Sequence, residues 1–380
     1  MNVIPKVPVV FKGKFPKSFV NDLEGWSFSR EKLEKNKGKL LTLDIDFGSV
    51  CTLNCPHCFR RNGHLDKIGA KEMSYDEIVW VVREAKKIGL ETIKFLGAGE
   101  PFESPNFLDF LEELKKMEIK SLIFTKGHVI GDDKLAKKYF GHKGIRNSKQ
   151  LVNKLKELKV SIFLGFNSFD IDRQDEMVGG VKGYALKRNK ALELLAKAGF
   201  NKTNPTRLCL AINPVTKDNY DEIFEMYKWA RVRNIHTIVT PTMVAGRASD
   251  PEFQKKITPS RENLIQLFVK IYKFNIEKDL QTLDELRRDG IASYAGVAPC
   301  NQVACGMYVR LDGIILRCPG DDVTIFGNAR KEPLEKIWKR SENFRRAGTY
   351  NCYCPPKDGK TIPKDFYSEV LKRLEKEFGK

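Results

Sequence analysis

The 380-residue sequence contains no long apolar run. No segment approaches the roughly 18 uninterrupted apolar residues that a membrane-spanning helix needs. The first residues, MNVIPKVPVVFKGK, also lack the apolar stretch and small-residue cleavage site of a secretory signal. We therefore expect a cytoplasmic protein.

Acidic residues are too few to balance the basic ones. The chain has 49 Asp and Glu against 67 Lys and Arg, a formal net charge of +18. Such an excess attracts phosphate-bearing or other anionic partners. Most of the lysines, however, alternate with glutamates in segments of helical period such as EVLKRLEKEFGK, as on a solvated, heat-stable surface. No RNA-binding signature is visible, so nucleic acid is a partner that the sequence does not favour.

The nine cysteines are clustered rather than scattered. In a reducing compartment such clusters indicate metal ligands rather than disulfides. One cysteine stands alone: Cys209 alternates with Leu208 and Leu210, and we expect it in the core. The other eight form two groups, Cys51, Cys55 and Cys58 in the first, and Cys300, Cys305, Cys318, Cys352 and Cys354 in the second.

Short β-branched runs alternate with helical-period segments, which predicts an α/β fold with a parallel sheet. Ser74 and Glu77 form a capping box for the first helix, and Gly89 ends it. Six consecutive right-handed βα units curl into an open barrel, whose chemistry lies at the carboxyl ends of the strands. The predicted strands are 40–47, 92–96, 121–125, 160–167, 207–213 and 236–240.

The pattern changes after the sixth strand. Two helices are predicted over about 260–290, a cysteine-rich and turn-rich α+β module follows, and a closing amphipathic helix begins near Pro363. The expected division is an N-terminal extension (1–39), the (βα)6 partial TIM barrel (40–247), a helical connector (248–297), the cysteine-rich module (298–356) and the C-terminal helix (357–380).

Three thiols follow the first strand in the loop CTLNCPHC. Thiolates are the soft ligands that iron-sulfur clusters select. Three of them leave one iron of a four-iron cluster open, and an open iron can chelate an amine and a carboxylate. A zinc site that uses His57 or His64 as fourth ligand is the alternative. The spacing, on the first strand of a six-unit half-barrel, favours the cluster.

Polar and glycine-rich turns follow the other strands. Gly97, Ala98, Gly99 and Glu100 come after the second, where glycines allow close backbone approach and a carboxylate accepts from an ammonium group. Each later turn could equally cap the next helix. These later turns contain Thr125-Lys126-Gly127-His128, Asn167-Ser168, Asn213-Pro214, and Met243 to Arg247.

With these motifs in this order, the sequence resembles the radical S-adenosylmethionine (SAM) superfamily. The resemblance implies that Cys51, Cys55 and Cys58 hold a [4Fe-4S] cluster and that His57 stands where an aromatic residue usually approaches the adenine. It implies that the GAGEP loop, with Ala98 in place of the family's second glycine, binds the methionine amine. It further implies contacts to SAM from Asn167, Ser168, Asn213 and the segment with Met243.

The second cysteine group resembles the SPASM or twitch auxiliary-cluster module. MYVRLDGIILRC predicts a hairpin that turns at Asp312-Gly313, and GNARKEPLEKIW predicts a loop and helix. The resemblance implies one auxiliary cluster, [4Fe-4S] in type, held by Cys300, Cys318, Cys352 and Cys354, with structural zinc as the alternative. Cys305 is spare: it is buried, or replaces Cys300 as ligand, or acts catalytically as a hydrogen donor.

The resemblance implies an oxidoreductase or maturase that takes an electron from a donor such as ferredoxin or flavodoxin and cleaves SAM to a 5′-deoxyadenosyl radical. A small molecule or cofactor precursor that carries phosphate is the favoured substrate, since about 40 residues before the first strand are few for a leader-peptide domain. Modification of a peptide or protein is the second candidate. The chain also lacks the terminal Gly-Gly expected of the molybdopterin enzyme. The alternative from another class is a non-catalytic zinc or iron-sulfur protein that binds RNA, which would not need the GAGEP loop.

Overall fold

The computed structural model describes residues 1–61, 72–321, 323–350 and 354–379. The strands in these ranges form one nine-stranded sheet in the order β6-β5-β4-β3-β2-β1-β7-β8-β9. Their bounds are β1 (Thr42–Ile45), β2 (Thr92–Phe95), β3 (Lys120–Thr125), β4 (Ser161–Gly165), β5 (Leu208–Val215), β6 (His236–Pro241), β7 (Gly306–Val309), β8 (Ile314–Leu316) and β9 (Ile325–Asn328).

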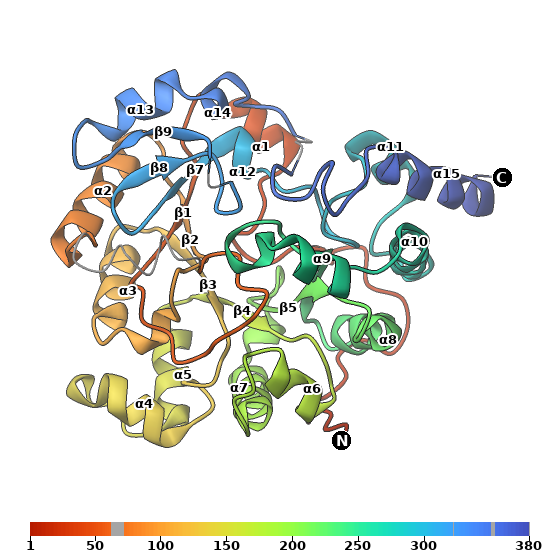
Figure 1. Ribbon diagram of the computed structural model, residues 1–380, viewed down its shortest axis with the longest axis horizontal. Helices are drawn as coiled ribbons and strands as arrows, with labels where there is room; N and C mark the ends of the chain where they lie inside the picture. Colours follow the sequence, from red (N-terminus) through yellow and green to blue (C-terminus); the bar gives the residue numbers. More distant parts are fainter. Residues whose placement is uncertain (62–71, 322, 351–353, 380) are drawn as a thin grey trace.

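Strands β1 to β6 pair in parallel in chain order, and the intervening helices range around their outer side (Figure 1). This confirms the predicted partial barrel. Among the described residues no helix is both long and apolar enough to cross a membrane. The helices are α1 (Arg30–Lys35), α2 (Tyr75–Lys87), α3 (Phe107–Lys116), α4 (Asp133–Phe140), α5 (Ser148–Glu157), α6 (Ile171–Glu176), α7 (Tyr184–Ala198), α8 (Tyr220–Arg231), α9 (Pro251–Ile257), α10 (Arg261–Glu277), α11 (Leu283–Asp289), α12 (Gln302–Cys305), α13 (Leu334–Arg340), α14 (Glu342–Arg345) and α15 (Phe366–Phe378).

The first two strands alternate between the main core and the inside of the barrel. Leu43 and Ile45 of β1 belong to the large hydrophobic cluster under the helices. Because successive side chains of a strand point to opposite faces, Asp44 points to the other side. Asp44 is in register with Lys94 of β2. The strands thus bring a charged pair into the barrel.

The cysteine-rich module continues the barrel sheet. Strand β7 pairs in parallel with β1, with Thr42 opposite Gly306, and β8 and β9 follow as antiparallel strands. The predicted hairpin is present, since β7 and β8 flank Asp312 and Gly313. Figure 1 shows this module beside α2 at the upper edge of the barrel. The sequence predicted the module but not its pairing with β1.

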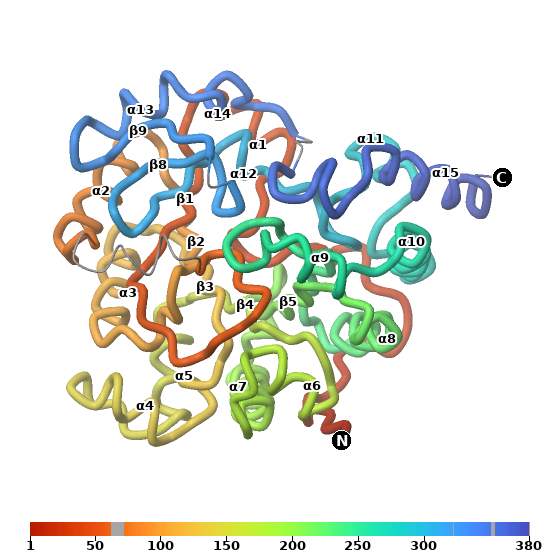
Figure 2. The backbone as a smooth tube through the Cα atoms, in the orientation of Figure 1, coloured from red at the N-terminus to blue at the C-terminus, as the bar shows by residue number. Residues whose placement is uncertain are grey.

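The chain before β1 wraps the barrel. Figure 2 shows it leaving the N-terminus near α6, passing α8 and arriving at α1 on the opposite side. On the way Leu23 forms a bridge with Thr206, and Trp26 is buried against Phe124 and Phe163. At the other end α15, which lies in the segment expected as a closing helix, packs on α10 and α11.

Candidate functional site

The three thiols of the CTLNCPHC loop border one cavity at the carboxyl ends of the strands. Cys51, Cys55 and Cys58 all line this space of about 180 Å³, called here the barrel cavity. Cys55 is buried and the other two are half-buried. Within the described ranges, no three His, Cys, Asp or Glu side chains converge tightly enough for a single metal ion. The three thiols surround a space rather than one point.

Without a positive charge beside them, the surroundings of these thiols disfavour their ionisation to thiolates. Burial, helped by the Glu100 carboxylate, raises the pKa of Cys51 to about 12. Burial also raises the pKa of Cys55, although the Lys126 ammonium opposes the shift. Thiolates are the metal-binding form, and metal binding releases the thiol protons. The donor set therefore fits an iron-sulfur cluster, which supplies the missing charge.

The glycines after β2 let that loop lie directly on the thiol loop. A Cβ at Gly99 would stand 2.3 Å from the carbonyl oxygen of Val50, a contact that no side chain could make. Gly97 has a φ of +58°, where its Cβ would meet the Gly99 carbonyl. The amide of Glu100 donates to Val50 over 2.9 Å. Gly97, Ala98, Gly99 and Glu100 all line the barrel cavity beside the thiols.

Glu100 is a buried carboxylate held by the turn after β3. It accepts hydrogen bonds from the Thr125 hydroxyl at 2.6 Å and from the Lys126 amide at 2.8 Å. Burial raises the pKa of Glu100 above its ordinary value. Glu100 also accepts a longer bond, 3.4 Å, from the Phe102 amide. A carboxylate has about four acceptor positions, so these three bonds leave one for an ammonium group of a ligand.

Glu103 is a functional residue that the sequence did not reveal. Its carboxylate accepts from the backbone amide of Thr52 (3.0 Å) and from the Thr52 hydroxyl (2.7 Å), and it lies 2.7 Å from His128 Nε2. Burial alone would raise the pKa of Glu103, but the hydrogen bonds from His128 and Thr52 hold it below the ordinary value. Because Thr52 follows Cys51, Glu103 fixes the start of the thiol loop.

Other predicted residues also reach the barrel cavity. His57, Asn213 and Met243 line it. The His57 ring is buried, which lowers its pKa well below the ordinary value, and Nε2 has no partner among the described residues. The segment after Met243 packs on the thiol loop, since the Arg247 amide donates to the Cys58 carbonyl over 3.0 Å.

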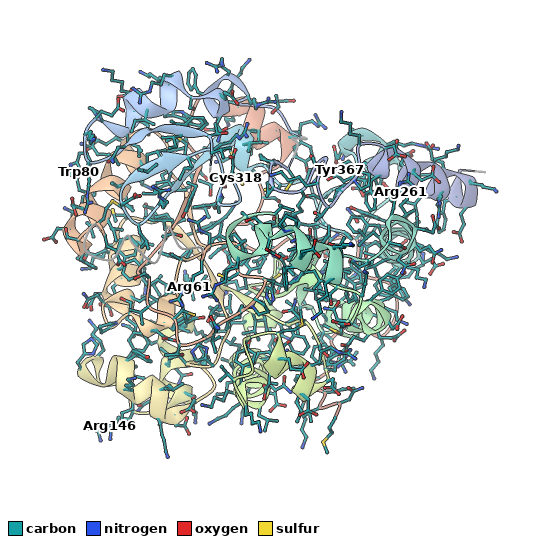
Figure 3. All side chains as sticks on the ribbon, viewed as in Figure 1. Arg61, Trp80, Arg146, Arg261, Cys318 and Tyr367 are labelled. Atoms are coloured by element: carbon teal, nitrogen blue, oxygen red, sulfur yellow. The ribbon has the colours of Figure 1, made fainter. Side chains whose placement is uncertain are left out.

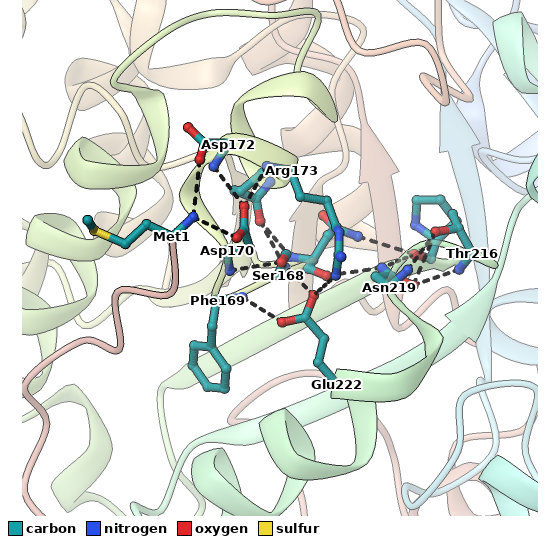
Figure 4. Close-up of polar contacts among 12 residues, drawn as sticks. Met1, Ser168, Phe169, Asp170, Asp172, Arg173, Thr216, Asn219 and Glu222 are labelled. Atoms are coloured by element: carbon teal, nitrogen blue, oxygen red, sulfur yellow. Dashed lines mark hydrogen bonds and ion pairs between the residues drawn. The ribbon is translucent and has the colours of Figure 1, made fainter.

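Asn167 and Ser168 do not border the barrel cavity. Both are fully buried where β4 meets the next helices. The amide of Asn167 donates to Gln174 over 2.7 Å, and its side chain donates to the Pro214 carbonyl. Ser168 donates to Glu222, the centre of the polar network in Figure 4. In this structure the two residues tie β4, α6 and α8 together, which sequence spacing could not distinguish from a ligand contact.

The second thiol group borders its own cavity. Cys300, Cys318 and Cys354 line a space of about 370 Å³, called here the module cavity. Cys300 and Cys318 also line the barrel cavity, so the two spaces meet. Figure 3 shows Cys318 on the module, toward the middle of the molecule, with Arg61, three residues after Cys58, below it. The fourth predicted ligand, Cys352, lies outside the described residues.

Cys305 lies away from both cavities. Its thiol donates to the Asn301 carbonyl at 3.2 Å, and it packs with Phe28, Leu33 and Leu41. This position agrees with buried packing, one of the three roles that the sequence left open.

A buried lysine stands beside the second thiol group. Lys357 has no exposed surface, donates to the Thr240 hydroxyl over 2.7 Å and lies 3.4 Å from the ring centre of Tyr294. Burial lowers the pKa of Lys357, whereas Cys354 and Cys300 oppose the shift. A buried ammonium is costly unless an anion compensates it. A thiolate-bound cluster is such an anion, so the residues of the module cavity fit one.

Polar residues also connect the thiol loop with the module. Arg60, two residues after Cys58, donates to the Pro319 carbonyl over 2.9 Å and contacts Tyr308 and Asp46. All of these side chains are buried. An arginine just after the CPHC motif carries no sequence signal for such a role, because most of its partners are far along the chain.

Comparisons with known proteins agree with this geometry. A model of the radical SAM superfamily matches residues 45–230, and the SPASM model, an iron-sulfur cluster-binding domain, matches residues 300–356. A tungsten-containing aldehyde ferredoxin oxidoreductase cofactor-modifying protein of Pyrococcus furiosus is 24% identical over 311 residues, which cover 78% of this chain and 80% of the relative. A probable GTP 3′,8-cyclase of Pyrococcus horikoshii is 26% identical over 319 residues, covering 80% and 94%.

The fold also matches solved structures. Streptococcus suis SuiB bound to the precursor peptide SuiA superposes with a TM-score of 0.56 at 18% identity, over 83% of this chain and 69% of SuiB. The first family model implies a [4Fe-4S] cluster that works with SAM, and the second implies auxiliary iron-sulfur binding. The chain thus belongs to the radical SAM superfamily and is an enzyme with a C-terminal SPASM iron-sulfur cluster-binding domain.

Proposed function

We propose that this enzyme cleaves SAM reductively and abstracts a hydrogen atom from a substrate in the barrel cavity. In this proposal Cys51, Cys55 and Cys58 ligate the [4Fe-4S] cluster. When bound, that cluster supplies the electron that breaks a carbon-sulfur bond of SAM, which gives methionine and the 5′-deoxyadenosyl radical. The electron comes from a donor such as ferredoxin or flavodoxin.

The chain's own residues bind and orient SAM. The glycines of the GAGEP loop leave backbone groups open at the cavity wall, and Glu100 accepts from the methionine amine. His57, Asn213 and Met243 line the same space, at positions suited to the nucleoside part. Glu103 keeps the thiol loop in place by its bonds to Thr52.

We assign Cys300, Cys318, Cys354 and Cys352 to the auxiliary cluster. Ligation by four thiolates leaves no iron open to substrate. That arrangement suits a site that takes one electron from the substrate radical, so that the net reaction is an oxidation or a bond formation. Support comes from the shared lining of the two cavities, because Cys300 and Cys318 border both.

For the substrate we favour a small molecule or cofactor precursor that carries phosphate, ahead of a peptide or protein. Lys94 and Lys126 line the barrel cavity and give it cationic groups. Two of the relatives are named as a GTP 3′,8-cyclase and a cofactor-modifying protein, which agrees with this preference. SuiB is named with a precursor peptide, so a peptide or protein remains the second candidate class of substrate.

The observation that carries the proposal is the convergence of three thiols, a glycine loop and a buried carboxylate on one cavity. The test is anaerobic reconstitution with iron and sulfide, followed by dithionite and SAM, with 5′-deoxyadenosine measured by chromatography. The wild type should form 5′-deoxyadenosine, and the variant with Cys51, Cys55 and Cys58 all changed to Ala should not.

Cys209→Ala is the matched control, since this thiol is buried in β5 and donates to Leu210. It should keep both the iron and the activity. The triple variant should retain about four irons, those of the auxiliary cluster. Equal 5′-deoxyadenosine from the triple variant and the wild type would refute the assignment of the three thiols, and zinc in place of the remaining iron would refute the auxiliary site.

A further inference from the structure

The floor of the barrel cavity holds a charged pair that SAM binding leaves unused. Asp44 of β1 and Lys94 of β2 are neighbours in register, and each is only 2% exposed. Both line the cavity. Lys94 is on β2, three residues before Gly97 in the loop that follows, so the pair lies below the loop that we assign to SAM.

Neither charge is satisfied by the described part of the chain. Asp44 Oδ1 has no hydrogen-bond partner there. Lys94 forms no ion pair with a described residue, and its ammonium lies 4.7 Å from the ring centre of Trp26. Burial raises the pKa of Asp44 to about 7, although Lys94 opposes the shift. Buried charges that lack bonded partners are costly, and such a cost is expected at a site that a ligand completes.

The walls beside the pair are aromatic. Trp26, Phe124, Phe163 and Tyr294 all line the cavity. The rings of Phe124 and Phe163 are stacked at 4.1 Å with an angle of 7°, and Trp26 lies 4.9 Å from Phe163. The indole Nε1 of Trp26 is a further buried donor without a described partner. Aromatic walls of this kind favour a flat, conjugated group.

We propose that Asp44 and Lys94 are the substrate anchor, and that they bind an N–H donor and an oxygen acceptor side by side on a ring-bearing small molecule. The carboxylate accepts from the N–H, the ammonium donates to the oxygen, and the ring packs against Trp26 and Phe163. This inference rests on the proposed function and adds the polar chemistry of the substrate to it.

The position of the anchor fits a substrate that both thiol groups can reach. Cys300 and Cys318 line the same cavity as the anchor, and so does the thiol loop. A molecule bound through Asp44 and Lys94 therefore lies between the two groups of cysteines. Two sources share this chemistry: the cyclic amide edge of a nucleobase, and the ammonium and carboxylate of an aromatic amino acid.

The test is equilibrium binding to the reconstituted enzyme with saturating SAM and no reductant, so that the SAM site is filled and no turnover occurs. Guanosine is the probe for the cyclic amide, and 1-methylguanosine, which lacks the ring N–H, is its matched control. L-Tryptophan is the probe for the amino acid, and tryptamine, which lacks the carboxylate, is its control. The variants are Lys94→Met, Asp44→Asn and the exposed surface variant Lys149→Met.

We expect one probe to bind the wild type and Lys149→Met with equal affinity. The same probe should bind Lys94→Met and Asp44→Asn at least about tenfold more weakly, because each of these two variants loses a bond to a charged group. The matched control should bind weakly to the wild type itself, a result that does not depend on how the variants fold. Binding of guanosine or of tryptophan identifies the source.

The inference is overturned if neither probe binds, or if probe and matched control bind alike. Formation of 5′-deoxyadenosine by the wild type without any probe is measured separately. If the wild type cleaves SAM but binds neither probe, only the anchor is wrong. If it cleaves no SAM, the proposed function itself fails.

Discussion

At the scale of single residues, buried charges mark the places where the protein needs a partner that is not part of the chain. Lys357 is the plainest case, because its ammonium is fully buried, with the Thr240 hydroxyl and the Tyr294 ring as neighbours and three cysteines nearby. A cation there stabilises the more negative, reduced form of a cluster bound by those thiols.

Lys357→Met should therefore lower the midpoint potential of the auxiliary cluster. We expect a shift on the order of 50 mV, close to the ~59 mV that a tenfold change in a one-electron equilibrium represents. A redox titration followed by electron paramagnetic resonance measures it. Lys360→Met, three residues on and exposed, is the control and should leave the potential in place. A potential that is the same in all three proteins would contradict this role.

Glu103→Gln should loosen the thiol loop. The amide cannot keep the charged bonds to Thr52 and His128, whose loss costs on the order of 2 kcal/mol. In a background with Cys300→Ala and Cys318→Ala, the remaining cluster should lose iron to a chelator several-fold faster than with Glu103 intact. The exposed variant Glu34→Gln should match the parent. Equal rates for Glu103→Gln and the parent would show that Glu103 does not hold the loop.

Sequence reasoning found the residues whose spacing is local and missed those whose partners are distant. Cys51, Cys55 and Cys58 share a loop, so their convergence was predictable. Glu103 meets Thr52 across 51 positions and Lys357 meets Thr240 across 117. No pattern within a short window encodes such contacts. Asn167 and Ser168 show a different limit. They lie outside the lining of the barrel cavity, and a polar turn has the same sequence signal whether it faces a ligand or caps a neighbouring helix.

At the scale of elements, two loops pack directly on each other at the proposed SAM site. The GAGEP loop lies on the backbone just before Cys51, with Gly99 in contact with Val50 and Ser49. Neither loop can move independently, so a side chain added between them displaces both.

Gly99→Ala should reduce 5′-deoxyadenosine formation at least about tenfold, since overpacking of this kind costs about 1–3 kcal/mol. Gly13→Ala is the same chemical change at a position where the new Cβ meets open space. It should leave the rate unchanged. SAM affinity and 5′-deoxyadenosine yield, measured side by side, decide the outcome, and similar values for both variants would contradict the proposed packing.

Most elements were predictable because their signals lie within them. The capping box of Ser74 and Glu77, for example, is present at the start of α2. The pairing of β7 with β1 was not predictable. Gly306 meets Thr42 across some 260 positions, and nothing in either segment specifies its neighbour in the sheet.

At the scale of the whole molecule, the barrel and the cysteine-rich module form one body through the shared sheet. Arg330 of the module also donates to Glu77 of α2. The C-terminal helix ties back to α10 through ion pairs such as Arg373 with Glu262. The division at residue 298 that composition suggested is thus crossed by backbone hydrogen bonds.

Limited proteolysis of the reconstituted enzyme should yield no stable fragment that begins near residue 298. Removal of β7 would leave β1 as an unpaired edge, so we expect the two parts to resist separation and to unfold together. Mass spectrometry of a digestion time course measures this. Accumulation of a folded fragment that begins near residue 298 would show that the module is an independent unit.

The pairing of β1 with β7 also determines how far apart the two thiol groups can be. One group follows β1. In the other, Cys300 precedes β7, the next strand in the sheet, and Cys318 follows β8, which pairs with β7. Adjacent strands keep a separation of about 4.8 Å, fixed by their hydrogen bonds rather than by a flexible linker. The rate of electron tunnelling falls steeply with distance. The fold of the sheet therefore determines the rate of electron transfer between two redox centres at these positions, and later domain motion does not change it.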